Sequence, residues 1–224
     1  MKRTKLIDRV LPTYTKGEEI FNMTSHILGV VLGVVVTVLC IVVAAVNGNT
    51  YGVISGAIYG TTMIILYTIS SVYHGLSSKC KGKKVLQIID HCTIFLLIAG
   101  SYTPFALCTF REYDTFTGWT IFGIIWGMAI LGIVLNAIDL KKYKLFSMIC
   151  YLGMGWAIIF KIHLLPSLLG INGFVFLLLG GIAYTVGTIF YGLGRNHKYM
   201  HSIFHLFILL GSLLQFFCIL FYVL

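Results

Sequence analysis

Two histidines four residues apart are the first feature of this sequence whose residue types could do chemistry. His201 and His205 stand in the stretch HSIFH, just before a long apolar run. Residues at positions i and i+4 share one face of an α-helix, so the two imidazoles point the same way. The pair is a weak zinc signal on its own, because histidines at a membrane interface also act as amphipathic anchors. The spacing alone leaves both interpretations open.

A second polar pair with the same spacing favours the metal interpretation. The stretch SSVYH places Ser70 one helical turn before His74. Three neutral imidazoles from two helices, with a water as the fourth ligand, make a zinc site with an open position, which is the arrangement of catalytic zinc. A helical serine considered alone is better explained by a bond to the backbone carbonyl one turn earlier, so Ser70 carries weight only as part of the set.

One aspartate completes the candidate site. Asp90 begins the stretch DHCTIF, near the start of an apolar segment. Its carboxylate and the Ser70 hydroxyl could orient the water of a zinc site or take its proton. The alternative for Asp90 is an ion pair with a loop lysine such as Lys84. The coincidence of two i, i+4 polar pairs and an aspartate at one depth favours the zinc site.

The other four histidines receive no ligand role. His26 lies at a suitable depth with Asn22 one turn before it, and the role of this pair is left open. His91 follows the aspartate directly and is expected to point to a different helix face. His163 is expected at a membrane interface and His197 in a solvated loop.

Long apolar segments must position these side chains. Hydrophobic residues make up 58% of the 224-residue chain, charged residues make up 10%, and the mean hydropathy is +0.96. Soluble domains carry about 25% charged residues, so we predict an all-α integral membrane protein. Its apolar segments are long enough to span a bilayer, and none has the period-two alternation of a barrel strand. Seven such segments cover residues 20–46, 51–74, 86–108, 117–138, 145–165, 171–194 and 199–223.

The distribution of positive charge predicts the orientation. Fourteen of the 16 Lys and Arg residues fall in the N-terminal tail and in every second loop. They are Lys2, Arg3, Lys5, Arg9, Lys16, Lys79, Lys81, Lys83, Lys84, Lys141, Lys142, Lys144, Arg195 and Lys198. The other side has only Arg111 and Lys161. Cytoplasmic loops carry the excess of Lys and Arg, so the N-terminus is predicted in the cytoplasm and the C-terminus outside.

The same assignment places the polar cluster and accounts for the net charge. Six of the 7 histidines, with Asp90, fall on the cytoplasmic side, and only His163 falls on the other. The net charge of +9 is explained by topology and by anionic lipid headgroups, not by nucleic acid. We predict a short basic cytoplasmic tail over residues 1–19, without a removable signal peptide, and one transmembrane domain over residues 20–224.

Four stretches of the chain resemble the hemolysin III family, the bacterial branch of the progestin and adiponectin receptor superfamily, which is related to the alkaline ceramidases. They are EEIFNMTSH, SSVYHGLS, DHCTIFLLIAGSYTPF and HSIFH, and their order and spacing match from about residue 18 onward. The resemblance implies seven helices, a cytoplasmic N-terminus and a zinc ion near the cytoplasmic face. By motif match, the zinc ligands are His74, His201 and His205, and Ser70 and Asp90 lie next to the zinc-bound water.

The resemblance also implies a set of functions. Family members with known activity are hydrolases of lipid amides or receptors with ceramidase-like activity. The first hypothesis is therefore a zinc-dependent hydrolase of a lipid amide or ester in the bacterial plasma membrane, with Asp90 as general base and Ser70 as its helper. The second is a receptor-like regulator of membrane lipid homeostasis with structural zinc. The tail of about 19 residues is much shorter than the extension of the receptors, which argues against hormone signalling. A hemolysin-type cytolytic protein ranks last, because the polar residues gather at one depth instead of crossing the membrane in file.

Overall fold

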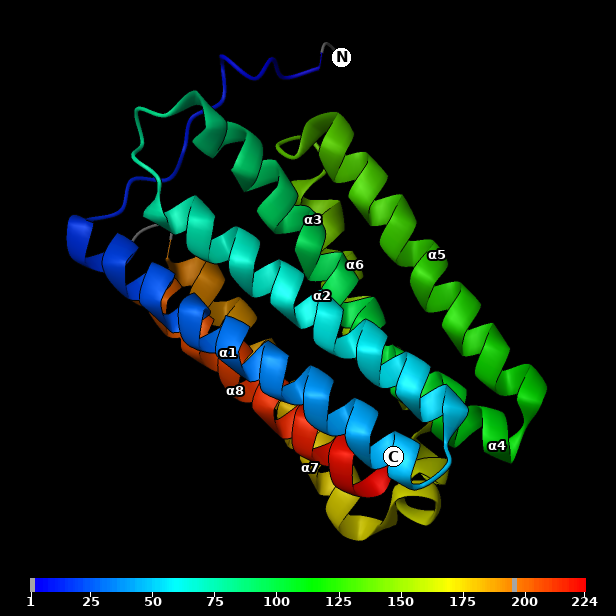
Figure 1. Ribbon diagram of the computed structural model, residues 1–224. Helices are drawn as coiled ribbons and strands as arrows, with labels where there is room; N and C mark the ends of the chain where they lie inside the picture. The colour runs from blue at the N-terminus through cyan, green and yellow to red at the C-terminus, as the bar shows by residue number, and fades with distance from the viewer. Residues whose placement is uncertain (1–2, 195–196) are drawn as a thin grey trace.

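The chain folds as a helical bundle. The computed structural model describes residues 3–194 and 197–224, and these described residues form helices and no strand (Figure 1). The long helices are α1 (Lys16–Val46), α2 (Thr50–Gly75), α3 (Lys81–Pro104), α5 (Thr115–Asp139), α6 (Lys144–Gly155), α7 (Leu165–Leu193) and α8 (Met200–Tyr222). Shorter elements are the π-helical η1 (Phe105–Phe110), α4 (Arg111–Tyr113) and the 3₁₀-helical η2 (Ala157–Leu164). Lys2 and Arg195, which were counted for the orientation, lie outside the described residues.

Helix α1 begins four residues earlier than the predicted segment. Thr15 and Glu18 form a capping box: the Glu18 amide donates to Thr15 Oγ1 at 3.3 Å, and the Thr15 amide donates to Glu18 Oε2 at 2.8 Å. This reciprocal pair satisfies two backbone donors that a helix start leaves open. The start at residue 20 was therefore wrong, and Glu19, assigned to the tail, belongs to the first turn of α1.

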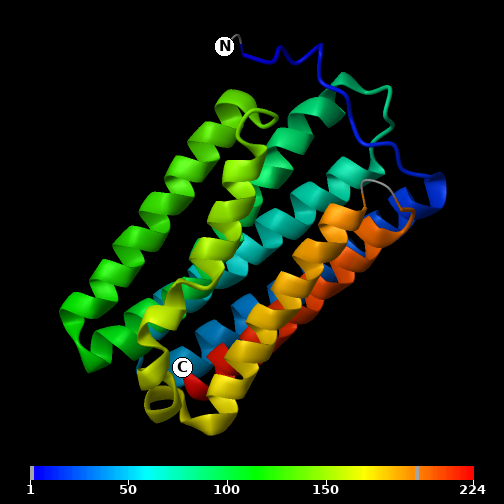
Figure 2. The ribbon, with the colours of Figure 1, turned by 180° about the vertical axis from the view of Figure 1, so that it is seen from behind.

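The membrane-protein fold class is confirmed, while the number of crossings stays a prediction. Among the described residues, 6 helical stretches are long and apolar enough to cross a membrane. One of them, Lys144–Leu193, contains two of the predicted segments. Its first part is the 12-residue α6 followed by η2, and a kink at Gly170, with φ 67°, interrupts α7 near its start. Figure 2 shows the chain passing through α6 and η2 and then turning back along α7.

The connections divide between the two ends of the bundle. One end holds the N-terminal segment, residues 3–15, and the α2–α3 and α5–α6 loops. The other end holds the C-terminus, α4 and η2 (Figures 1 and 2). The described basic loops thus share an end with the N-terminal segment, as the charge count requires. Which end faces the cytoplasm stays a prediction.

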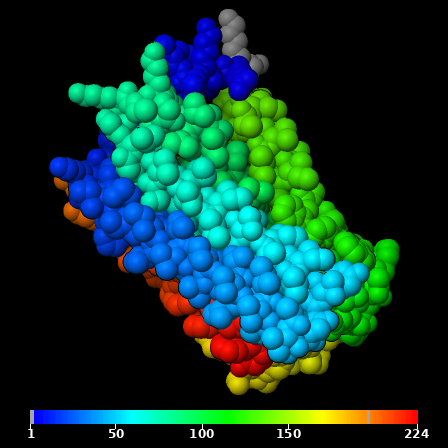
Figure 3. Space-filling model, in the orientation of Figure 1, coloured from blue at the N-terminus to red at the C-terminus, as the bar shows by residue number. Residues whose placement is uncertain are grey.

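Close packing of α1 on α2 brings the polar cluster together. The two helices lie side by side across one face (Figure 3), and α1 also packs on α8. Small residues permit the close approach: a Cβ at Gly29 would collide with the ring of Tyr67, and one at Gly60 with the side chain of Thr37. The opposite face of α1 exposes aliphatic side chains, as expected of a surface that meets lipid. They include Val31, Val35, Val38 and Val42.

Candidate metal centre

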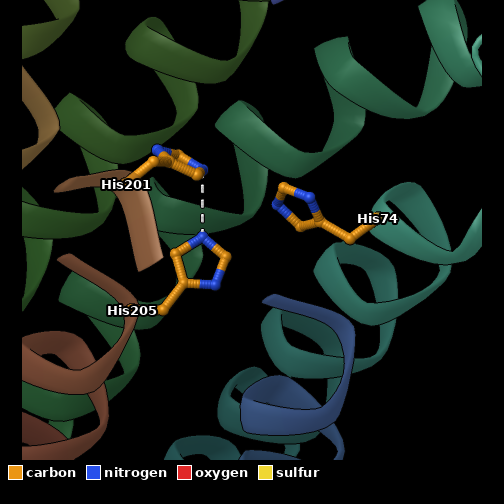
Figure 4. Close-up of side chains that lie close together, drawn as sticks. All are labelled: His74, His201 and His205. Carbon is orange, nitrogen blue, oxygen red and sulfur yellow. Dashed lines mark hydrogen bonds between the residues drawn. The ribbon is translucent and has the colours of Figure 1, made fainter. Parts of the chain in front are cut away.

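Three histidines from two helices converge inside the bundle. His74 comes from the last turn of α2, and His201 and His205 come from the first two turns of α8 (Figure 4). One ring nitrogen of each lies within 4.8 Å of the others, and all three residues are buried. The Nε2 atoms of His201 and His205 are 3.0 Å apart. The structure thus brings together the three residues that the sequence proposed as zinc ligands.

The donor set fits a zinc ion. His74 Nε2 is buried and has no hydrogen-bond partner among the described residues. Leaving a buried polar atom unpaired costs about 1–3 kcal/mol. A cation or a hydrogen-bond donor bound at His74 Nε2 would remove this cost. Imidazole nitrogens suit zinc, and three of them leave a fourth position free for water or substrate.

The start of α8 is held in place by the start of α1. Tyr199, just before α8, adopts a left-handed backbone conformation with φ 62°. Its amide donates a hydrogen bond to Glu18 Oε1 at 2.7 Å. Glu18 therefore both caps α1 and fixes the turn that aims His201 and His205 into the bundle.

His74 has a polar partner that the sequence analysis missed. Its Nδ1 lies 2.7 Å from Glu19 Oε2, and Glu19 Oε1 lies 2.6 Å from the Nζ of Lys83. Lys83 is buried and also donates to the Leu76 carbonyl at 2.8 Å. The available signal was that Glu19 stands in EEIFNMTSH, one of the stretches that carry the family resemblance. It was overlooked because helix α1 was expected to begin after it.

Ser70 and Asp90 share a cavity with the histidines of α8. The cavity has a volume of about 190 Å³ and is bordered by residues of α2, α3, α6, α7 and α8, with Ser70, Asp90, His201 and His205 among them. Ser70 is buried, and the side chain of Asp90 is 16% exposed. The alternative partner for Asp90 is engaged elsewhere, since Lys84 Nζ donates to the Ile7 carbonyl at 2.7 Å.

The N-terminal segment covers this end of the bundle. The Tyr14 ring stacks on His201 with centroids 4.9 Å apart and an interplanar angle of 20°, and its centroid lies 5.8 Å from that of His74. The hydrogen bonds that hold the segment include the one from the Thr4 amide to Asp139 Oδ2 at 2.8 Å and the one from Arg9 to Gln87 at 2.9 Å. Burial raises the pKa of the Tyr14 phenol, so its hydroxyl stays neutral at physiological pH. The sequence had predicted only a basic tail here.

The remaining histidines divide into two groups. His26 is buried with its ring centroid 4.0 Å from that of His205, and neither of its nitrogens has a hydrogen-bond partner in the part of the chain that the structure describes. His91 lines the cavity, but its Nδ1 donates to the Gln87 carbonyl and its Nε2 accepts from Tyr191. His163 and His197 are exposed, as expected.

Comparison with known proteins places this chain in a family. The model of the family described as "Haemolysin-III related" matches residues 14–216. The chain belongs to this family. "Hemolysin-3" of Bacillus cereus is 42% identical over 207 residues, which cover 92% of each chain. "Hemolysin-3 homolog" of Bacillus subtilis (strain 168) is 41% identical over 209 residues, covering 93% of this chain and 96% of that protein.

A more distant similarity extends beyond bacteria. "Monocyte to macrophage differentiation factor" of Homo sapiens is 28% identical over 173 residues, covering 74% of this chain and 69% of that protein. These matches confirm the hemolysin III resemblance and support the wider superfamily. With the membrane-length helices, they make this hemolysin III family protein a multi-pass membrane protein.

Proposed function

We propose that this hemolysin III family protein is a zinc-dependent hydrolase of a membrane lipid amide or ester, acting at the cytoplasmic side of the membrane. The observation that carries the proposal is the convergence of three buried histidine nitrogens within 4.8 Å, two of them from residues that line a cavity of about 190 Å³. His74, His201 and His205 would hold the ion. When bound, zinc supplies a Lewis acid for the substrate carbonyl and lowers the pKa of its water toward about 7.

The polar residues of the cavity supply the proton chemistry. Asp90 takes a proton from the attacking water as that water adds to the substrate carbonyl, and returns it to the amine or alcohol that leaves. Ser70, buried one turn from His74, donates a hydrogen bond to the carbonyl oxygen as it gains negative charge. Both residues line the cavity that His201 and His205 border, which supports these roles.

The rest of the cavity suits an acyl chain. Its walls on α3, α7 and α8 include Leu97, Ile98, Phe174, Leu177 and Ile208. Each methylene of an acyl chain buried against such walls contributes about 0.8 kcal/mol. The basic loops at the same end of the bundle favour anionic lipid headgroups over neutral ones. Membrane lipid, and not nucleic acid, is therefore the proposed partner.

Metal analysis joined to lipid analysis tests the proposal. The purified protein in detergent is expected to contain about one zinc ion per chain by elemental analysis. Incubation with extracted membrane lipids is expected to release a fatty acid, detected by mass spectrometry, and removal of zinc by a chelator is expected to stop the release. Protein that carries no metal after purification in zinc-containing buffer would contradict the proposal.

A lipid regulator with structural zinc is the first alternative. The observation behind it is that the three histidines join α2 to α8, so a bound ion would also stabilise the bundle. In that case zinc removal lowers the melting temperature, while no lipid is consumed at any zinc occupancy.

A cytolytic protein is the second alternative, favoured by the name of a relative that is 42% identical, "Hemolysin-3" of Bacillus cereus. Under this alternative the purified protein releases dye from liposomes, and a chelator does not change the release. Dye release that depends on zinc, or no release at all, argues for the other two functions.

A further inference from the structure

A carboxylate at the start of α1 bridges the candidate metal centre and a buried lysine. Glu19 Oε2 lies 2.7 Å from His74 Nδ1, and Glu19 Oε1 lies 2.6 Å from Lys83 Nζ. We propose that Glu19, itself held by Lys83, is a positioning residue that fixes the orientation and tautomer of His74 for the metal. This inference rests on the zinc site of the proposed function and deepens it.

The hydrogen bond to Glu19 determines which nitrogen of His74 is free. A carboxylate only accepts hydrogen bonds, so the proton of a neutral His74 must sit on Nδ1. Its Nε2 then carries the lone pair, and this is the buried atom without a hydrogen-bond partner among the described residues. Carboxylate partners of metal-binding histidines fix ring orientation and raise ligand basicity in this way.

His74 needs such a partner more than the other two ligands do. His201 and His205 share one face of α8, so the helix itself sets their relative position. His74 is the single ligand on α2 and stands in the last turn of that helix, where the backbone is least constrained. Glu19 supplies a second anchor for its ring from α1.

Lys83 fixes the carboxylate in turn. Its side chain is 3% exposed, and its ammonium donates to Glu19 and to the Leu76 carbonyl just after α2. A lysine buried to this extent is costly unless its charge is paired. Lys83 therefore ties α3 to the start of α1 and the end of α2 around His74. Its neighbour Lys84 differs, because its ammonium donates to the Ile7 carbonyl in the N-terminal segment.

Two double variants of nearly equal side-chain volume separate positioning from packing. Glu19→Gln/Lys83→Met keeps an oxygen that can accept the proton of His74 Nδ1, whereas Glu19→Met/Lys83→Met does not. Neither variant leaves a buried charge unpaired. Zinc dissociation constants are measured by competition with a chelator of known affinity, together with the visible spectrum of the cobalt-substituted protein and the melting temperature of the metal-free protein.

We expect zinc to bind about 10–100-fold more weakly to the Met/Met variant than to the Gln/Met variant. The cobalt spectrum is expected to change in the Met/Met variant, and the metal-free Met/Met protein is expected to melt at a lower temperature than the Gln/Met protein, because the buried Nδ1–H of His74 has lost its acceptor. Lys84→Met is the matched control and is expected to bind zinc as the wild type does. If the Met/Met variant does not fold, Glu19→Leu/Lys83→Met takes its place in the same comparison.

The outcomes distinguish this inference from the proposed function. Equal zinc affinities and equal cobalt spectra in the two double variants would overturn the positioning role while the zinc site stands. A wild-type protein that binds no zinc would overturn the site and the positioning role together.

Discussion

The candidate metal centre consists of three histidine side chains whose nitrogens have few other partners among the described residues. Removing either His201 or His205 leaves two ligands, which is too few for a stable zinc site in competition with water. We expect His201→Ala and His205→Ala each to lower the zinc content from about one ion per chain to nearly none. His163→Ala is the control, because His163 is exposed and far along the chain from the cluster. Elemental analysis of the folded variants measures their zinc content. Stoichiometric zinc in both His201→Ala and His205→Ala would contradict the ligand assignment.

At the scale of single residues, the Asp90→Asn variant also distinguishes an enzyme from a regulator. It lines the cavity but is not one of the three residues that converge, so its loss is expected to leave zinc in place. General base catalysis contributes about 10²–10⁴-fold, and we expect Asp90→Asn to lower lipid hydrolysis by that factor at unchanged zinc content. Asp114→Asn is the matched control, since Asp114 is exposed and caps the start of α5, where Asn serves equally well. Wild-type turnover in Asp90→Asn would remove Asp90 from the mechanism.

At the scale of elements, the N-terminal segment covers the candidate metal centre. The Tyr14 ring stacks on His201, and contacts between aromatic rings contribute about 0.5–1.5 kcal/mol. We expect Tyr14→Ala to keep its zinc but to lose it to a chelator roughly two- to tenfold faster than the wild type, as that energy implies. Tyr113→Ala, at an exposed tyrosine of α4, is expected to behave as the wild type. Stopped-flow detection of chelated zinc measures the rates, and equal rates for both variants would mean that the segment does not limit access.

The sequence was sufficient for the parts of the site that depend on local spacing. One turn of α-helix sets the relation between His201 and His205, and that between Ser70 and His74, whatever the rest of the fold does. The lengths of the apolar segments and the charges of the loops assigned each polar residue to one side of the membrane. This assignment put Asp90 and His74 at the same depth as His201 and His205. These relations survive errors of a few residues in the ends of the helices.

The parts that escaped prediction depend on contacts between elements. Glu19 was missed because a capping box at Thr15, and not the apolar pattern, sets the start of α1. The N-terminal segment has no periodic pattern, so its hydrogen bonds to Asp139 and Gln87 could not be read from the chain. The predicted helix 145–165 contains Gly153 and Gly155, which disfavour helix, and the structure replaces its second half with η2.

At the scale of the whole molecule, the orientation in the membrane decides which leaflet supplies the substrate. Cys80 is a natural probe, because it is exposed in the α2–α3 loop at the end of the bundle that holds the N-terminal segment, while the other five cysteines are buried. With that end in the cytoplasm, a membrane-impermeant maleimide is expected to label Cys80 only after spheroplasts are permeabilised.

A cysteine at the other end supplies the matched control. Glu112 in α4 carries a charged side chain that is 64% exposed, so Glu112→Cys in a Cys80→Ser background is expected to react in intact spheroplasts. Labelling of Cys80 in intact spheroplasts, with Glu112→Cys protected, would reverse the topology. The histidine cluster would then face the exterior, and the proposed hydrolase would draw its substrate from the outer leaflet. The cysteine pair therefore tests the side of action independently of any measurement of zinc or of lipid turnover.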